Sequence, residues 1–343
     1  MSRHVNIPIF IPHLGCPNQC VFCNQRTISG VKEFDPCQVD RLISDALSTV
    51  EEGDEVEIAF FGGSFTGIDR ELMIALLEAA YHYVKNGRVQ SIRCSTRPDY
   101  ITHEIVEILK KYGVKTVELG LQSTADKILK ATKRGHNFEA EINACKIIVN
   151  SGLDLVGQMM IGLPESDLNS EIETARFIID SGAVGARIYP TVVFRDTELC
   201  CMMENGEYSP LALDDAIERS ARVLEMFIDA GVKVIRIGLQ AGESLSSANS
   251  YAAGPNHPAL GELTENRFYY NKISKTLSGM KLSGDERIEI LVSRGSLSKA
   301  VGQKKINKIR LADKYKNISF AESDKISGYD ILACINDGEH ICI

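Results

Sequence analysis

The sequence predicts an α/β protein, a partial (βα)6 TIM-type barrel followed by a small α/β domain. Short apolar runs of strand length alternate with longer segments in which apolar residues recur at helical spacing. Six such units follow one another between residues 5 and 193, which implies parallel strands joined by right-handed crossovers. An open doubly wound sheet is the alternative architecture.

The expected elements follow in order along the chain. Strands are expected at residues 5–12, 55–61, 91–96, 114–121, 153–161 and 186–193, and helices at residues 36–50, 70–84, 102–112, 137–151 and 168–181. A helix at 213–231, a strand at 232–237 and a long loop at 240–258 come next. Functional groups of such folds collect at the C-terminal ends of the strands, which is where we expect one shared site.

Composition limits the class of protein. The chain has 343 residues, of which 44% are hydrophobic and 24% charged, as in ordinary globular proteins. We expect one large domain at residues 1–267 and a smaller one at 282–343. There is no apolar run of about 18 residues and no signal-peptide core, so we expect no membrane contact and a cytoplasmic location. The net charge of -8 restricts nucleic-acid contact to a local basic surface.

Three cysteines, Cys16, Cys20 and Cys23, lie in the loop after the first expected strand. Thiolates at such spacing suit zinc, a disulfide or an iron-sulfur cluster. A structural zinc site needs four ligands, and no second Cys-x-x-Cys exists, although His13 is a candidate fourth ligand or a cap of the strand end. Three thiolates can hold a 4Fe-4S cluster with one open iron. An auxiliary cluster on other cysteines, such as the pair Cys200-Cys201, is a further alternative.

The spacing Cys-x-x-x-Cys-x-aromatic-Cys resembles the signature of the radical S-adenosylmethionine superfamily. The resemblance implies that S-adenosylmethionine binds the open iron and is cleaved to methionine and a 5'-deoxyadenosyl radical. It also implies that Phe22 packs against the adenine and that Gly62-Gly63 contacts the methionine amino group. Ser64 follows the two glycines where many members have Glu.

Further cofactor contacts are expected at the strand ends. Glu118 lies inside an apolar strand, where a ligand ribose or an arginine would satisfy its carboxylate. Arg97 and Arg187 are candidates to pair with a cofactor carboxylate or with Glu118, and a purely structural ion pair is the alternative. By the same resemblance, the remaining shell residues are Gln122, Gln158 and Gly162.

A second resemblance covers residues 5–265 and concerns the radical domain of the Elongator catalytic-subunit family. Its motifs occur in one order, at residues 16–23, 95–99, 117–123, 134–136, 162–164, 188–191 and 197–199. In that family the domain acts on the wobble uridine of tRNA with acetyl-CoA and a separate acetyltransferase domain. We expect no such domain after Arg267, so the substrate is left open.

The C-terminal segment is expected to form strands at 288–292, 318–321 and 329–335 and helices at 296–301 and 306–315. Its residues 298–312 are similar to the Gly-x-x-Gly region of KH domains, with Lys305 in place of the second glycine. The resemblance implies that Gly302, Lys304, Lys305 and Lys308 contact a nucleic-acid backbone. An ordinary α/β appendage with a solvated basic face is the alternative.

The resulting hypothesis is a radical enzyme that modifies an RNA base, in tRNA, with a 4Fe-4S cluster, S-adenosylmethionine and an electron donor such as a flavodoxin or ferredoxin. One alternative is radical chemistry on a free small molecule, which the net negative charge would suit. Another is an RNA-binding protein with a structural metal. The reaction type, the catalytic side chains and the oligomeric state are left open.

Overall fold

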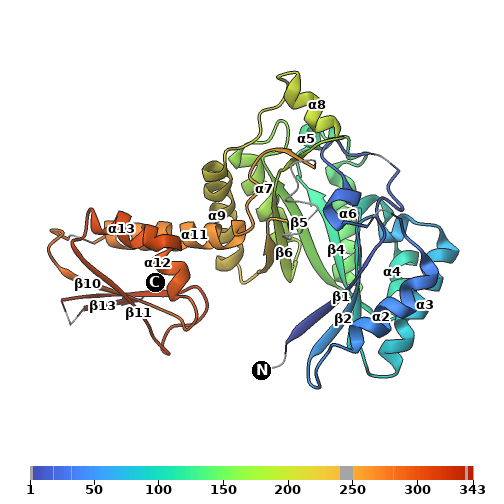
Figure 1. Cartoon of the computed structure of the whole chain (residues 1–343), viewed down its shortest axis with the longest axis horizontal. Coiled ribbons are helices and arrows are strands. Elements are labelled where there is room, and N and C mark those ends of the chain that lie inside the picture. The colour runs from blue at the N-terminus through green and yellow to red at the C-terminus, as the bar shows by residue number, and fades with distance from the viewer. Residues whose placement is uncertain are drawn as a thin grey trace. The chain divides into compact units, whose positions relative to one another are not determined.

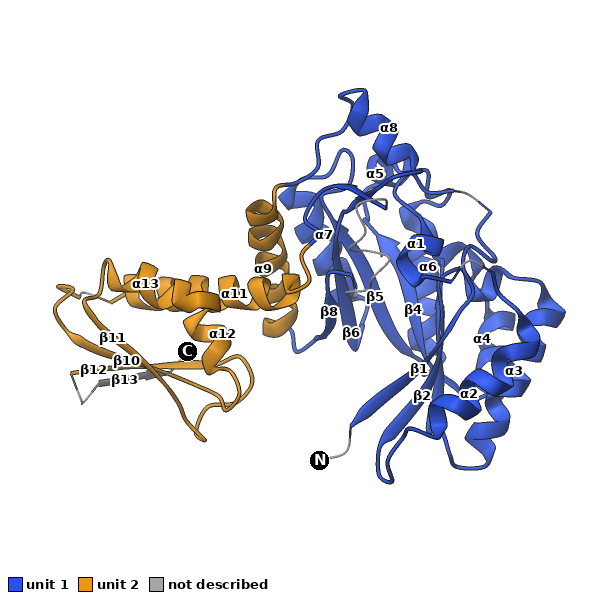
Figure 2. Cartoon of the chain, in the orientation of Figure 1, with its two compact units in different colours: residues 1–211, 230–256 blue, residues 212–229, 257–343 orange. Residues whose placement is uncertain are grey.

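The computed structural model describes residues 3–17, 19–31, 33–239, 250–280, 282–336 and 339–342, the last of these as backbone alone. Its contacts divide the chain into two compact units, shown in Figure 2. Unit 1 comprises residues 1–211 and 230–256, and unit 2 comprises residues 212–229 and 257–343. The domain limits 1–267 and 282–343 remain a prediction, because compactness alone does not show which segments fold independently.

Unit 1 contains a curled sheet of seven parallel strands, which confirms the partial barrel (Figure 1). The strands are neighbours in chain order apart from one omission: β1 (His4–Phe10), β2 (Glu55–Phe61), β3 (Ser91–Thr96), β4 (Val114–Gln122), β5 (Asp154–Ile161), β6 (Gly185–Pro190) and β8 (Lys233–Ile237). The omitted strand, β7 (Val193–Phe194), pairs with β9 (Tyr251–Ala253) instead.

Helices connect these strands, with α2, α3 and α4 along the outer side of the sheet in Figure 1. The described helices of unit 1 are α1 (Gln25–Ser29), α2 (Val39–Leu47), α3 (Arg70–Lys85), α4 (His103–Lys111), α5 (Asp126–Ala131), α6 (Phe138–Asn150), α7 (Leu168–Asp180) and α8 (Glu198–Glu204). Side-chain caps explain several of their starts, since Asn137 accepts from Ala140 N and Asp167 forms a capping box with Ser170.

The two faces of the sheet differ in polarity. The outer face packs tightly on helices, so that a side chain on Gly157 would lie 2.7 Å from Ile178 of α7. The inner face carries buried charges from three strands, Glu57, Arg93 and Glu118. Because buried charges need partners, the charged inner face of the partial barrel must be satisfied by ion pairs or by a polar ligand.

Unit 2 combines two long helices, α9 (Leu213–Asp229) and α11 (Leu260–Ser278), with a small sheet. The sheet order is β11 (Asn317–Glu322), β10 (Arg287–Val292), β12 (Ile331–Ile335) and β13 (Glu339–Cys342), and α12 (Leu297–Val301) and α13 (Ile306–Ala312) lie between β10 and β11 in the chain. Strand β10 pairs in parallel with β11 and antiparallel with β12. The small α/β domain is thereby confirmed.

Some elements differ from the expectations. The helices α1, α5, α8 and α11 were not expected, and the strand expected at 186–193 is interrupted after Pro190. Helix α11 buries polar side chains, among them Thr264 and Asn266, so its apolar spacing is weak in the sequence. Part of the loop expected at 240–258, residues 240–249, lies outside the described residues. In the described part of the chain, no helix is long and apolar enough to cross a membrane.

Candidate cluster and cofactor site

The cysteine loop follows β1 and lies directly on the glycine turn that follows β2. Ser64 N donates to Leu14 O at 2.9 Å. A side chain on Gly63 would lie 2.4 Å from the Leu14 carbonyl oxygen, and one on Gly15 would lie 2.2 Å from that of Ser64. Gly62 adopts a left-handed φ of 92°. The glycines therefore allow two backbones to meet, and whether they also contact a cofactor stays a prediction.

The three thiols of the loop lie close enough to influence one another electrostatically. Cys20 is buried, while Cys16 and Cys23 are half-buried. Burial, followed by the neighbouring thiols, raises the pKa of Cys23 to about 12, and burial also raises the pKa of Cys16. Among the described residues, no three His, Cys, Asp or Glu side chains already stand in metal-binding geometry. The thiols of Cys16 and Cys23 thus stay protonated until a cation displaces their protons, as expected of soft metal ligands.

Backbone and apolar contacts fix the middle of the loop. Val21 N donates to Thr132 O at 3.2 Å, and Leu199 N donates to Val21 O at 2.8 Å. Phe22 is half-buried and packs against the apolar cluster of Val21, Val193, Leu199, Cys200 and Tyr208. Its contact with an adenine ring stays a prediction. Cys200 is buried in this cluster and Cys201 is exposed, so the adjacent pair points in different directions.

His13 makes a structural hydrogen bond within the loop and does not lie as a fourth ligand beside the thiols. Its Nε2 atom accepts a hydrogen bond from Gln25 N at 3.1 Å, which joins the end of β1 to the first turn of α1. Burial lowers its pKa, so the ring is neutral and can accept this bond at neutral pH.

Arg134 is the site residue that sequence reasoning missed, although it stands in one of the family-like motifs. It is 6% exposed, and its Nη1 donates to the Sγ atom of Cys20 at 3.5 Å. Its Nη2 donates to Gly120 O, while its Nε has no partner in the described part of the chain. No carboxylate of the described residues pairs with it. A buried guanidinium beside thiols, without a counter-charge, is costly unless an anion binds there.

Gln122 lies beside Arg134, and Arg97 carries a similar unpaired atom. A side chain on Gly120 would lie 3.1 Å from Gln122 Nε2 and 3.2 Å from Arg134 Nη2, so both groups cover the same glycine. Gln122 Oε1 and Arg97 Nη1 are buried without a hydrogen-bond partner among the described residues. Arg97 is otherwise paired with Asp99 through bonds of 2.9 and 2.8 Å. A polar, partly anionic ligand would satisfy these orphaned atoms.

Glu118 has protein partners for both oxygens. It accepts from Arg93 at 2.9 Å, from Arg187 at 2.8 and 3.0 Å, and from Gln158 at 3.0 Å. Arg93 continues the network to Glu57 at 2.8 Å. The geometry is that of the structural ion pair considered as an alternative. Cofactor contacts of Glu118, Arg187 and Gln158 remain a prediction.

Gly162 is also engaged by the protein itself. Its N–H donates to Glu171 Oε1 at 2.7 Å, and its carbonyl accepts from the Tyr208 hydroxyl at 2.7 Å. Its φ of 76° favours glycine, and a side chain would lie 2.6 Å from Leu211. The glycine therefore shapes the loop after β5, and its role in cofactor binding stays a prediction.

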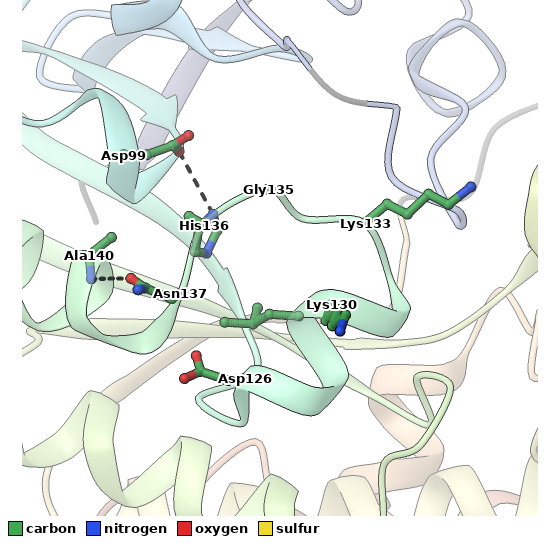
Figure 3. Close-up of a pocket in the computed structure, with 9 residues that line it drawn as sticks. Asp99, Asp126, Lys130, Lys133, Gly135, His136, Asn137 and Ala140 are labelled. Carbon is green, nitrogen blue, oxygen red and sulfur yellow. Dashed lines mark hydrogen bonds and ion pairs between the residues drawn. The ribbon is translucent and has the colours of Figure 1, made fainter.

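A cavity of about 850 Å³ lies next to Arg134, with Lys130, Lys133, Gly135 and His136 in its lining (Figure 3). His136 Nε2 is 3.0 Å from Glu141 Oε1, and its Nδ1 is 3.7 Å from Asp99 Oδ1. Burial, followed by the charge of Arg134, lowers the pKa of His136 to about 3, and burial raises the pKa of Glu141 well above its usual value. His136 is therefore neutral at neutral pH, and burial disfavours the charged form of Glu141, the form that would offset the charge of Arg134.

The predicted nucleic-acid loop of unit 2 has an unusual backbone. Lys304 and Lys305 have φ angles of 53° and 61°, and both side chains are exposed, as is that of Lys308. Left-handed backbone costs a non-glycine residue about 1–2 kcal/mol. Lys305 thus adopts the conformation that the second glycine of a Gly-x-x-Gly loop would adopt without cost. Contact with nucleic acid stays a prediction.

Comparison with known proteins now adds to this geometry. The radical SAM superfamily matches residues 10–178, and its radical SAM C-terminal domain matches residues 183–270. The first match covers the cysteine loop and strands β2 to β5, and the second covers strands β6 and β8. The chain belongs to the radical SAM superfamily.

Similar proteins extend the family comparison. The tRNA uridine(34) acetyltransferase of Methanocaldococcus infernus is 28% identical over 244 residues, which cover 59% of this chain and 46% of that protein. Elongator complex protein 3 of Bos taurus is 30% identical over 193 residues, covering 50% of this chain and 35% of the relative. The solved structure of archaeal M. infernus Elp3 has a TM-score of 0.63 at 24% identity, covering 80% of this chain and 64% of that one, and supports the fold. The chain spans about half the length or less of these curated relatives.

Radical SAM enzymes use a 4Fe-4S cluster and S-adenosylmethionine. The residues of this chain fit such a pair in two respects. The three thiols supply soft ligands, and Arg97, Gln122 and Arg134 each bury a polar atom that has no hydrogen-bond partner among the described residues. Of these, Arg134 was recognisable in the sequence only as part of Arg-Gly-His at residues 134–136, because nothing local indicates which side of the helix end it faces.

Proposed function

We propose that this radical SAM enzyme modifies a base of tRNA, with the cluster on Cys16, Cys20 and Cys23. The observation that carries the proposal is the buried, uncompensated guanidinium of Arg134 at 3.5 Å from Cys20 Sγ. The cluster and S-adenosylmethionine together would supply a 5'-deoxyadenosyl radical. Amino-acid side chains cannot generate such a radical, so the protein's part is binding, orientation and exclusion of water.

The chain's own groups divide this work. Arg134 would balance negative charge brought by thiolates or by a carboxylate of S-adenosylmethionine, and Gln122 would accept a hydrogen bond through its orphaned Oε1. The ion pair of Arg97 with Asp99 leaves Nη1 free to donate as well. The core contacts of Val21 and Phe22 would hold the loop in place while the ligands bind.

Relatives named as acting on tRNA uridine support the choice of substrate, although the match covers only part of their length. The exposed lysines of the loop between α12 and α13 supply a basic surface in a chain of net charge -8. Charge concentrated against the overall sign is suited to phosphate contacts. We therefore favour tRNA over a free small molecule.

The test uses the full chain, reconstituted with iron and sulfide without oxygen, together with S-adenosylmethionine, a chemical reductant and tRNA from cells that lack this protein. We expect 5'-deoxyadenosine to form and one tRNA nucleoside to change mass. A Cys20→Ala variant should lose both products, and Cys37→Ala should keep them, because Cys37 is exposed and outside the loop. Formation of 5'-deoxyadenosine with every nucleoside unchanged would favour the small-molecule alternative.

A further inference from the structure

Arg236 lies on β8, the last strand of the seven-stranded sheet (Figure 2). The strand register places it opposite Arg187, Arg187 opposite Gln158, and Gln158 opposite Gly120. Registered neighbours of a parallel sheet share a face. Arg236 therefore lies on the same inner face as Gly120, which Arg134 and Gln122 cover.

Among the residues that the structure describes, Arg236 has no counter-charge. Arg93 and Arg187 both pair with Glu118, and Arg97 pairs with Asp99. By contrast, no described carboxylate lies within ion-pair distance of Arg236, whose side chain is half-buried. Glu118, which lies on the same face two residues before Gly120, already has partners for both of its oxygens.

The position of Arg236 is electrostatically unfavourable by itself. Arg187 is its direct neighbour in the sheet, and like charges side by side destabilise a sheet. A conflict of this kind inside an otherwise paired network marks functional positions more often than structural ones. An anion between β6 and β8 would turn the repulsion into attraction.

The neighbouring inner positions are only partly covered by protein. Tyr189 and Met160 are registered neighbours one step further toward the strand ends, and both are only half-buried. Burial raises the pKa of Tyr189, and the positive charges of Arg187 and Arg236 act in the opposite direction. An aromatic ring, a flexible thioether and an unpaired guanidinium together suit a nucleotide, whose base can stack and whose phosphate is anionic.

We propose that the inner face formed by Met160, Tyr189 and Arg236 binds the substrate nucleotide, with Arg236 holding its phosphate. The inference rests on the proposed function, because it places a tRNA nucleotide on the same face as the cofactor groups. It adds a binding residue on β8 that the cysteine motif and the family resemblance do not indicate.

The test measures tRNA binding by the reconstituted enzyme, with fluorescent tRNA, over a series of salt concentrations. Arg236→Gln should raise the Kd about tenfold and reduce the slope of log K against log salt by about 1, the contribution of one phosphate contact. Arg236→Lys should retain most of the salt slope. Arg41→Gln is the matched control, since Arg41 is exposed on α2. Affinity for S-adenosylmethionine should stay unchanged in all three variants.

A second arm separates failure of this inference from failure of the proposed function. Uridine 5'-monophosphate and uridine are compared as ligands of the same protein. One outcome is a wild-type enzyme that fails to bind tRNA and yet binds the monophosphate more tightly than uridine, with Arg236→Gln abolishing this difference. That result would support the phosphate site and contradict tRNA as the substrate. If Arg236→Gln matches the wild-type Kd and salt slope for tRNA and the wild-type preference for the monophosphate, the proposed phosphate site is wrong.

Discussion

Arg134 donates a hydrogen bond to the Sγ atom of Cys20 from a buried position, at 3.5 Å. The guanidinium brings positive charge to the middle thiol of the trio, while burial lowers the pKa of His136 and raises the pKa of Glu141. This pair links the loop of β1 to the segment after α5, which are more than a hundred residues apart. The contact gives the first prediction.

Arg134→Gln should weaken S-adenosylmethionine binding and lower the iron content after reconstitution, because it removes the positive charge that faces the thiols. Loss of a charged hydrogen bond is worth about 1.5–3 kcal/mol, or roughly 10- to 150-fold in affinity. Equilibrium dialysis at matched iron content gives the affinity. Arg134→Lys keeps the positive charge and should retain part of the affinity for S-adenosylmethionine. Wild-type affinity and iron content in Arg134→Gln would show that Arg134 does not belong to the cofactor site.

Gly63→Ala should disorganise the cysteine loop, since the added carbon would lie 2.4 Å from Leu14 O and 2.6 Å from Ile11 O. Both obstacles are backbone atoms and cannot rotate away, so iron uptake should fall sharply. Gly279→Ala is the control, because there the nearest atom is 3.4 Å away and φ is ordinary. Iron and sulfide analysis of the reconstituted proteins decides the point, and equal iron content in both variants would contradict the expectation.

Glu118→Gln should lower the free energy of unfolding by about 3–5 kcal/mol, because it leaves Arg93 and Arg187 buried with a weakened counter-charge. Glu104→Gln removes an exposed pair with Arg70 at 2.7 Å and should cost about 1 kcal/mol or less. Urea unfolding of both variants tests the difference. If Glu118→Gln loses little stability but binds S-adenosylmethionine more weakly, Glu118 contacts the cofactor and is not merely part of a structural ion pair.

The pKa of His136 predicts a pH effect with a definite sign. In the folded protein it lies near 3, so below about pH 6.5 the unfolded chain binds a proton that the folded chain does not. Stability attributable to His136 therefore falls as the pH drops from about 6.5 toward 3. The raised pKa of Glu141 acts in the opposite direction, so the effect must be measured as a difference between variants.

Urea unfolding at pH 7 and pH 5 provides that difference. His136→Gln should lose less stability between these values than the wild type, because glutamine keeps a hydrogen bond to Glu141 without titrating. His82→Gln changes an exposed histidine of α3 and should follow the wild type. A wild-type pH slope in His136→Gln would show that the ring is charged or solvated in the fold.

Two kinds of variant separate the contribution of the lysine charges from that of the left-handed backbone in the loop of residues 302–305. Lys304→Glu with Lys305→Glu should weaken tRNA binding and flatten its salt dependence, whereas Lys305→Gly should remove left-handed strain of about 1 kcal/mol and cost only one charge. S-adenosylmethionine cleavage without tRNA should persist in both. Unchanged tRNA affinity and salt slope in the double Glu variant would reduce this loop to a structural feature.

The sheet and the cysteine loop were predictable because their signals are local. Alternating apolar runs specify strands and crossover helices, and the spacing of Cys16, Cys20 and Cys23 needs only one loop to bring three thiols near one another. The glycines at 62 and 63 were recognised as a place of close approach. Their neighbour, the backbone of Leu14 in the cysteine loop, was visible only in the fold.

Side-chain partners were decided by tertiary structure. Glu118 was recognisable as a buried carboxylate, but four strands had to assemble before Arg93, Gln158 and Arg187 could surround it. Arg134 and Arg236 look alike in the sequence, and only burial and strand register show that each carries an uncompensated charge on the inner face. Local patterns report which segments become strands, whereas the pairing of charges depends on distances between strands that sequence spacing does not contain.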